Sequence, residues 1–464
     1  MMNIKPSRER SLYLLLAAPL IALLCVFALG FKWERDAAEE VNATLTTLTR
    51  DGHPVGNHSL TEWFDSHTTQ QASSQWDDIL VATDGLHIRF SDVLPLDDEP
   101  RLEPNQPWAD AEIMQRYAEQ ARPIIEAIKR VPTHPRPVWQ PVVFEGFQTT
   151  YPGLDETRSI NRLLMREFRV AVDQQDPARA IHALQLMPKV ADAFDWQIGI
   201  LSDLIYFAAV EEHRAQIRES LAVGFWKTEE SLLQLREQVN REQNLHDRWD
   251  TAVAAERAFL LAEFGITSDG PNHFQQESQI DFFPFGLTDM MGELLMERYQ
   301  RWEDAETIKA FEPWPPQARS LRHEDGDDIW TYSILAVPVS NAEIFLDKFF
   351  GDPSSAAARF YRFELNRRWT LTAIAIKQFQ KRYERFPNEL SELSDVGLTE
   401  SDWMVNSQES FGYEVGKGGK VAYLWSVDYE RAMGPNGEPV VAMERPVASD
   451  HRNEKIEKWV SEIR

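Results

Sequence analysis

Apolar side chains recur at three- and four-residue spacing along most of this chain, which is the period of a helix with one buried face. The spacing is most regular from Asp155 to Gly265, where five such stripes follow one another. Asp176-Pro177 places a capping acid before a proline at the first helical position, and Gly224 follows the third stripe. The pattern predicts a mainly α fold whose body is an antiparallel multi-helical bundle or an α-solenoid-like stack. A fixed repeat length is missing from the sequence, which excludes a consensus tetratricopeptide array.

Residues 32–131 are predicted to form an N-terminal helical region. Its first helix carries an apolar stripe that ends at a turn: Trp33, Ala37, Val41, Leu45, Leu48, then Asp51-Gly52. Further along, Leu86, Ile88 and Phe90 alternate with His87 and Arg89, which predicts a short strand. Four prolines between 132 and 141 prevent a regular helix there. Residues 132–154 are therefore predicted to be an extended boundary segment before a helical domain at 155–350.

An α+β module is predicted at residues 351–430. Apolar residues at helical spacing predict a long helix from about Ser355 to Tyr383. After it, two runs alternate between apolar and polar residues around a glycine turn: Phe411, Tyr413 and Val415, then Gly418-Gly419, then Tyr423, Trp425 and Val427. This pattern predicts a β-hairpin whose aromatic faces pack on the helix. Residues 431–464 are predicted to form a C-terminal tail with a short helix.

The run Leu12–Phe31 holds twenty residues without a charge. A helix of this length spans about 30 Å, the thickness of the hydrocarbon core of a bilayer. Lys5, Arg8 and Arg10 precede the run and acidic residues follow it. The positive-inside bias then predicts a cytoplasmic tail at 1–11, a single-pass anchor at 12–31 in the cytoplasmic (inner) membrane, and an extracytoplasmic main domain. Ala28-Leu29-Gly30 would suit cleavage of a signal peptide, but the apolar run exceeds the usual length, so we prefer the anchor.

The formal net charge is −26, and the main domain is more acidic still because the first 31 residues are net basic. A field of this sign repels phosphate backbones, so nucleic acid is excluded as a partner. The single cysteine, Cys25, lies inside the predicted anchor. The exported part therefore has neither disulfides nor thiol catalysis, and its stability must come from its core.

No cofactor and no metal ion are predicted. Glu211-Glu212-His213 and Glu242-x-x-x-His246 lie on neighbouring predicted helices, but a carboxylate di-metal site requires Glu-x-x-His. The acidic segment 324–328 offers oxygen ligands, but it lacks the spacing and the final Glu of an EF-hand. Nucleophile elbows and phosphate loops are also missing from the sequence, so no catalytic residue is assigned.

Aromatic residues gather in two stretches that are not predicted to be regular helix. They are Trp139, Phe144, Phe147 and Tyr151 in the proline-rich segment, and Phe282, Phe283 and Phe285 in a loop. One interpretation is that they plug the core between neighbouring parts of the chain. The other is a partner surface or groove, where exposed aromatic side chains stack on sugars or on apolar side chains.

Short motifs near the C-terminus resemble the helix-plus-hairpin of pseudopilin-like proteins: Arg385-Phe386-Pro387-Asn388-Glu389-Leu390, Gly412-Tyr413, Tyr423-Leu424-Trp425-Ser426-Val427 and Gly434-Pro435-Asn436-Gly437. Pseudopilins of the major type bind calcium near the last of these loops, but an insertion at 428–433 displaces it here, so we expect no calcium site. The prepilin signal is missing, so the chain is not a pilin.

The chain as a whole resembles a family of planctomycetal exported, membrane-anchored proteins that carry the same C-terminal pattern. The resemblance also rests on Asp51-Gly52-His53-Pro54-Val55, Leu60-Thr61-Glu62-Trp63, the helical run from Arg158 to Leu186 and Glu256-Arg257-Ala258-Phe259. The resemblance implies architecture and localisation, and it implies no activity.

Two functions follow from these observations. The first is a membrane-tethered extracytoplasmic interaction or scaffold protein of the bacterial cell envelope, because helical stacks commonly bind protein partners on their concave faces. The alternative is a carbohydrate-active enzyme, a glycosidase or lyase on a helical toroid. Such an enzyme requires two carboxyl groups roughly 5–9.5 Å apart, flanked by aromatic residues.

Overall fold

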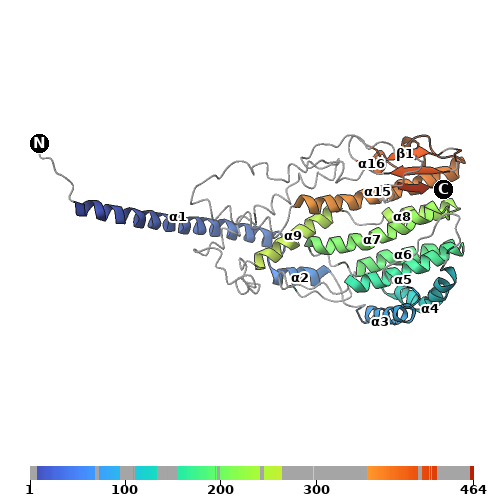
Figure 1. Cartoon of the computed structure of the whole chain (residues 1–464), viewed down its shortest axis with the longest axis horizontal. Helices are drawn as coiled ribbons and strands as arrows, with labels where there is room; N and C mark the ends of the chain where they lie inside the picture. Colours follow the sequence, from blue (N-terminus) through green and yellow to red (C-terminus); the bar gives the residue numbers. More distant parts are fainter. Residues whose placement is uncertain are drawn as a thin grey trace.

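The computed structural model describes most of the chain in separate stretches: residues 8–67, 73–94, 110–132, 154–193, 199–240, 245–263, 353–405, 410–416, 421–425 and 460–463, with a few single positions between them. At several helix ends, including residues 8–20, it describes the backbone alone. Within this part the protein is mainly helical with a small antiparallel sheet, so the predicted fold class is confirmed (Figure 1).

The helices of the N-terminal region and body are α1 (Arg8–Arg50), α2 (Asn57–His67), α3 (Ser73–Phe90), α4 (Ala111–Arg130), α5 (Leu154–Asp173), α6 (Pro177–Ala193), α7 (Gly199–Ala222), α8 (Glu229–Asn240) and α9 (Leu245–Glu263). The C-terminal module contains α15 (Pro353–Tyr383), the 3-10 helix η2 (Leu390–Val396), α16 (Glu400–Trp403), and the strands β1 (Gly412–Val415), β2 (Ala422–Trp425) and β3 (Val460–Ile463). The helices from α3 to α7 pack in sequence order, and α15 covers α7 and α8.

Helix α1 is unbroken from Arg8 to Arg50, and Figure 1 shows that it projects from one end of the body. Its predicted stripe is confirmed at Ala37 and Val41, which are buried. Gly52, with φ of +82°, ends the helix in the left-handed conformation that favours glycine. Among the residues whose side chains the structure describes, none of the helices is both long and apolar enough to cross a membrane.

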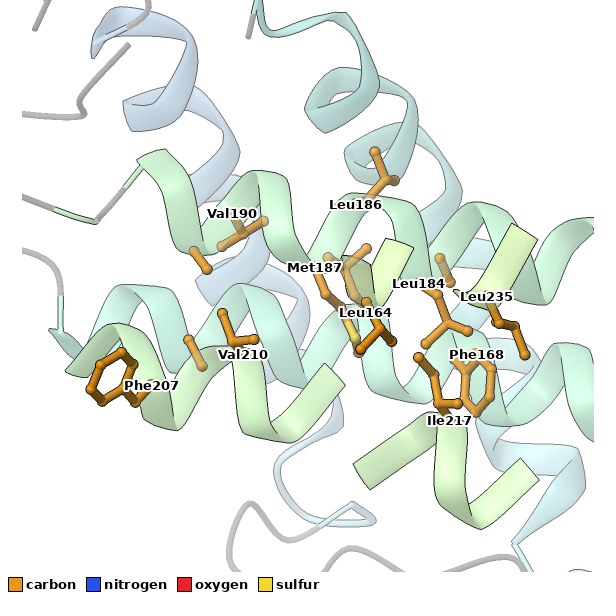
Figure 2. Packing of buried hydrophobic residues seen from close by; sticks show 14 of the residues in the cluster. Leu164, Phe168, Leu184, Leu186, Met187, Val190, Phe207, Val210, Ile217 and Leu235 are labelled. Carbon is orange, nitrogen blue, oxygen red and sulfur yellow. The ribbon is translucent and has the colours of Figure 1, made fainter. Parts of the chain in front are cut away.

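Two helices of the body, α6 and α8, begin directly after a capping residue. The Asp176 carboxylate accepts a hydrogen bond from the backbone N–H of Arg179 at 3.1 Å, and α6 begins at Pro177. Thr228 caps α8 in the same way, accepting from the N–H of Ser231 at 3.2 Å. These caps fix the turns, and the apolar faces then interdigitate in one buried cluster that includes Leu164, Phe168, Leu184, Met187 and Ile217 (Figure 2).

The strand predicted at residues 86–90 is wrong, because this stretch is the last part of helix α3. Trp76, Ile79, Thr83, Leu86 and Phe90 are all buried at helical spacing, so one face of a helix accounts for them. Ile88, which the alternating pattern placed beside Leu86 and Phe90, is 73% exposed. The helical period prevailed over the alternation of a strand, because it buries the whole apolar stripe of α3 against α4 and α5.

The long C-terminal helix is confirmed as α15, and its apolar residues Phe363, Leu371, Ile374 and Phe379 are buried. The hairpin is also confirmed: β1 and β2 are antiparallel, and Gly418 and Gly419 have φ of +89° and +67°. The Tyr413 hydroxyl donates a hydrogen bond to the Pro387 carbonyl at 2.8 Å, which joins the sheet to the segment after α15.

The predicted faces of the second strand are wrong by one residue. Tyr413 pairs with Leu424, so Leu424 shares the face of Tyr413 and is fully buried. Trp425 pairs with Gly412 on the other face, and a Cβ at Gly412 would lie 2.0 Å from Trp425 Cε2. The large indole therefore lies over a glycine and is only half buried.

The short helix predicted for the tail is contradicted at residues 460–463. These residues form β3, which pairs antiparallel with β2 and gives the sheet the order β1-β2-β3. This pairing gives hydrogen-bond partners to the backbone groups that β2 would otherwise expose at the edge of the sheet. The local sequence of the tail does not reveal this stabilisation, which comes from a distant strand.

We expect Leu424→Ala to lower the free energy of unfolding by about 2–5 kcal/mol, because it removes a fully buried side chain. The neighbouring Tyr423→Ala, on the half-exposed face, should cost clearly less. Urea unfolding of the two variants measures the difference. A larger cost at Tyr423 would contradict the observed register.

Candidate functional site

The structure places one of the predicted partner-surface aromatics in the core. Phe144 is buried, with its ring centroid 6.0 Å from that of Phe64 and 5.7 Å from that of Phe259. The prediction of an exposed partner surface is therefore wrong for Phe144. Its ring packs between α2 and α9, where the large apolar surface of the side chain is removed from water. The remaining members, Trp139, Phe147, Tyr151, Phe282, Phe283 and Phe285, lie outside the described residues, and their assignment stays a prediction.

The Glu211-Glu212-His213 group serves packing instead of metal binding. Glu211 forms ion pairs with Arg214 and Arg218, while the His213 imidazole is buried, with Nε2 3.3 Å from Gln238 Oε1. Burial lowers the pKa of His213 to about 4, so the ring is neutral at pH 7. Nowhere in the part of the chain that the structure describes do three or more histidine, cysteine or acidic side chains converge on a metal position.

A buried ionic cluster, which no sequence motif predicted, surrounds Arg248 of α9. Arg248 Nη1 lies 2.8 Å from Asp195 Oδ2, Nη2 lies 3.0 Å from Asp195 Oδ1, and Nη2 also donates to Asp203. The three side chains are each at most 2% exposed. The guanidinium carbon lies 3.8 Å from the ring centroid of Tyr206, so the charge also rests on an aromatic face.

Arg248 stays charged in this environment. Burial by itself would lower its pKa, but the carboxylates of Asp195 and Asp203 outweigh burial and raise it above its usual value. A glycosidase needs one carboxyl group protonated as a general acid and a second one ionised. Asp195 and Asp203 share one guanidinium instead, so this pair of carboxylates does not supply that chemistry.

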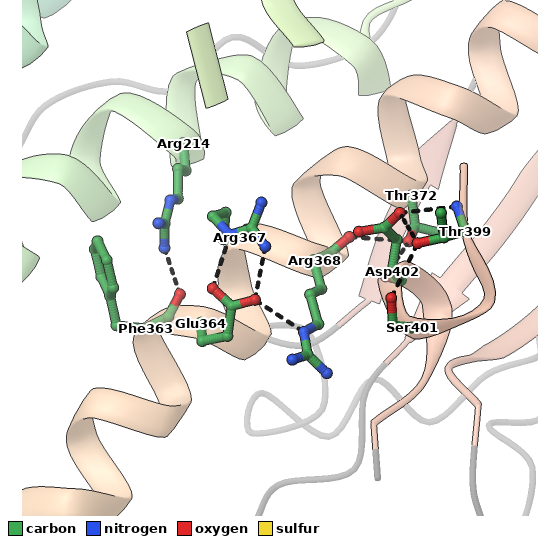
Figure 3. A network of polar contacts seen from close by, with 9 residues as sticks. All are labelled: Arg214, Phe363, Glu364, Arg367, Arg368, Thr372, Thr399, Ser401 and Asp402. Carbon is green, nitrogen blue, oxygen red and sulfur yellow. Dashed lines mark hydrogen bonds and ion pairs between the residues drawn. The ribbon is translucent and has the colours of Figure 1, made fainter. Parts of the chain in front are cut away.

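A second set of charged contacts lies along α15, and one of them joins this helix to α7 (Figure 3). Arg214 of α7 is fully buried, donates to the Phe363 carbonyl and lies 3.8 Å above the Phe363 ring. Directly after Phe363, Glu364 accepts hydrogen bonds from Arg367 at 2.7 Å and from Arg368 at 2.9 Å. Burial alone would raise the pKa of Glu364, but the two arginines lower it, so the carboxylate remains ionised.

The most catalytic-looking contact joins a serine to a histidine. Ser159 Oγ lies 3.0 Å from His87 Nδ1 and 3.2 Å from Asp84 Oδ1. Burial and the nearby charges of Arg166 and Arg162 lower the pKa of His87 to about 4. A base this weak withdraws little of the serine proton, because efficient bases have a pKa near the working pH. The contact therefore serves chiefly to fix α3 against α5.

Comparisons of this chain with protein families, with curated proteins and with solved structures found no match. The resemblance to planctomycetal exported proteins and to the pseudopilin-like module therefore stays a prediction.

We expect Arg248→Ala to lower the free energy of unfolding by about 3–5 kcal/mol, because two buried carboxylates lose their guanidinium. Arg35→Ala is the matched control, since Arg35 pairs with Asp36 at the surface, and its effect should stay within about 0.5 kcal/mol. Chemical denaturation compares the two. Equal effects would show that the Arg248 cluster contributes nothing to stability.

His213 gives a pH prediction. Its pKa is about 4 in the folded protein and about 6.5 when unfolded, so unfolding takes up a proton between these values. Its contribution to stability is complete above pH 6.5 and is lost as pH falls toward 4, by an amount on the order of 3 kcal/mol. His213→Gln should lose less stability than the wild type between pH 7 and pH 4.5, whereas the exposed control His58→Gln should follow the wild type. Parallel curves for all three proteins would be the contrary result.

Proposed function

We propose that this protein is a membrane-tethered extracytoplasmic scaffold or interaction protein of the bacterial cell envelope. One observation carries the proposal: α1 is a single helix that contains both the uncharged run Leu12–Phe31 and the buried positions Ala37 and Val41. The same element thus joins the predicted anchor directly to the folded body.

The continuity of α1 sets the distance between bilayer and body. Ala37 follows Phe31 by six positions, which corresponds to about 9 Å of helix. A flexible linker would let a domain sample many positions, whereas a helix keeps both distance and direction. On this proposal the body stands next to the headgroups, with its helices held in a fixed orientation for a partner.

The charge pattern supports the orientation. Lys5, Arg8 and Arg10 precede the apolar run, while Glu34, Asp36, Glu39 and Glu40 follow it within a few residues. Basic residues are retained on the cytoplasmic side. The proposed arrangement is therefore an inner-membrane protein with its N-terminus inside and its acidic body outside.

The internal construction of the body suits a scaffold. Its C-terminal module is joined to the helices of the body by Arg214 and by Arg218, which donates to Thr370 at 2.8 Å. A partner that binds either the module or the helices would then contact one rigid unit. The likeness of this module to the pseudopilin helix-plus-hairpin agrees with an envelope protein that binds other proteins, and both remain part of the proposal.

Fractionation tests the anchor. The protein should stay in the membrane pellet after washes with high salt and with carbonate, and its N-terminal sequence should begin before Leu12. A soluble mature protein that begins at Phe31 would show that the apolar run is a cleaved signal peptide.

Cysteine labelling tests the orientation. In a Cys25→Ala background, the protein has no other thiol. A membrane-impermeant maleimide applied to spheroplasts should label Thr46→Cys, at an exposed position of α1, and should spare Ser7→Cys until detergent is added. The inverse pattern would place the body in the cytoplasm and refute the proposal.

A further inference from the structure

The outward face of helix α3 carries two large apolar side chains that the body leaves in water. The opposite face of α3 packs on α4 and α5, and Figure 1 shows the helix at the outer edge of the stack. Val81 is 75% exposed and Ile88 is 73% exposed, the two highest fractions among the large apolar side chains that the structure describes. Because they are seven residues apart on a helix, they lie on the same face.

Gly85 lies between these two side chains and is also exposed. No described atom lies within 4 Å of the position that a Cβ would take there, so no contact within the described body requires a glycine. Glycine destabilises the interior of a helix relative to alanine, and valine and isoleucine are weaker helix formers than the long polar residues that suit a solvated face. A glycine between two exposed apolar side chains does suit the close approach of another backbone.

Carboxylates flank this apolar strip. Asp77, Asp78 and Asp84 are exposed on α3, and Arg89 is the only exposed basic residue of the helix. The Arg89 side chain folds back along α3, where its Nε donates to the Gly85 carbonyl at 3.1 Å. The apolar strip therefore lies in a field that is negative on balance and that attracts a basic partner.

We propose that this α3 outer face, defined by Val81, Gly85, Ile88, Asp78 and Asp84, is the docking surface for an amphipathic helix of a partner protein. The apolar residues of that helix would bury Val81 and Ile88, and flanking lysines or arginines would pair with the aspartates. A second copy of this chain fits poorly, because it would bring the same aspartates together and each chain has a formal net charge of −26. Anionic lipid headgroups are repelled for the same reason.

This inference names the class of partner for the interaction protein proposed above, and its biological role rests on that proposal. Docking on the α3 outer face does not require the membrane anchor. Fractionation tests the anchor and peptide binding tests the docking surface, so the two proposals fail separately.

Fluorescence anisotropy of a labelled peptide tests the docking surface, with the full chain at constant detergent concentration. The probe is a synthetic helix of 18 residues, the length of α3, with leucines along one face and lysines on either side of them. One control peptide has glutamates in place of the lysines, and the other has the same composition in scrambled order. The wild type should bind the basic helix at least about tenfold more tightly than either control.

Substitutions of the two apolar side chains test where the peptide binds. Val81→Gln with Ile88→Gln should weaken binding of the basic helix at least about tenfold. Leu233→Gln is the matched control, since Leu233 is an exposed apolar residue on α8, and it should leave the affinity unchanged.

Substitutions of the aspartates test the charge of the partner. Asp78→Asn with Asp84→Asn should weaken binding and reduce its dependence on salt concentration. Glu39→Gln with Glu40→Gln removes the same charge from exposed positions of α1 and should change neither quantity.

Gly85→Leu separates docking from folding. Leucine is a better helix former than glycine and the space around Gly85 is open, so the variant should melt at no lower temperature than the wild type. Its side chain should nevertheless block the close approach and weaken binding at least about tenfold.

Three results would contradict the proposal. Equal affinity of the wild type, of Gly85→Leu and of the Val81→Gln, Ile88→Gln double variant would overturn the docking surface. Equal binding of the basic and acidic helices would overturn the charge assigned to the partner. A dimer in sedimentation equilibrium that Ile88→Gln dissociates would make a second copy of the chain the occupant.

Discussion

One buried, charged guanidinium fixes the position of the helices of the body relative to the C-terminal module. Arg248 of α9 binds Asp195 and Asp203, and its guanidinium lies on Tyr206 of α7. The adjacent Phe207 stacks on Phe363 of α15, with ring centroids 4.1 Å apart. Apolar helix faces tolerate small shifts, but a buried charge separated from its partners costs several kcal/mol. We infer that this cluster fixes how α7 and α9 meet, and thereby where α15 and the sheet dock.

The buried cations Arg248 and Arg214 follow the same physical constraint. Arg248 lies between the carboxylates of Asp195 and Asp203, and Arg214 pairs with Glu211 and donates to the Phe363 carbonyl. Around both residues the fold itself supplies the compensating groups, so these residues belong to its architecture.

The sequence by itself determined several features that depend on neighbours along the chain. Helix starts at Pro177 and Glu229 follow from capping residues next to them, and the ends of α7 and α9 follow from glycines and polar turns. The long helix α15 and the glycine turn of the hairpin were also predictable, since both are encoded in runs of adjacent residues. The surroundings of the aromatic residues were not predictable in this way, because Phe144 carries the same sequence signal whether it is exposed or packed on Phe259.

Tertiary structure decided what depends on residues distant in sequence. The alternation at 86–90 suits a strand locally, but the buried surfaces of α4 and α5 select the helical period. In the hairpin, alternation allows either face of β2 to point inward, and the pairing of Leu424 with Tyr413 against the core makes the choice. Arg248 meets Asp195 across 53 residues, so this cluster leaves no local motif. The free energy of burial depends on contacts between residues that are distant in sequence, so local sequence patterns do not predict it.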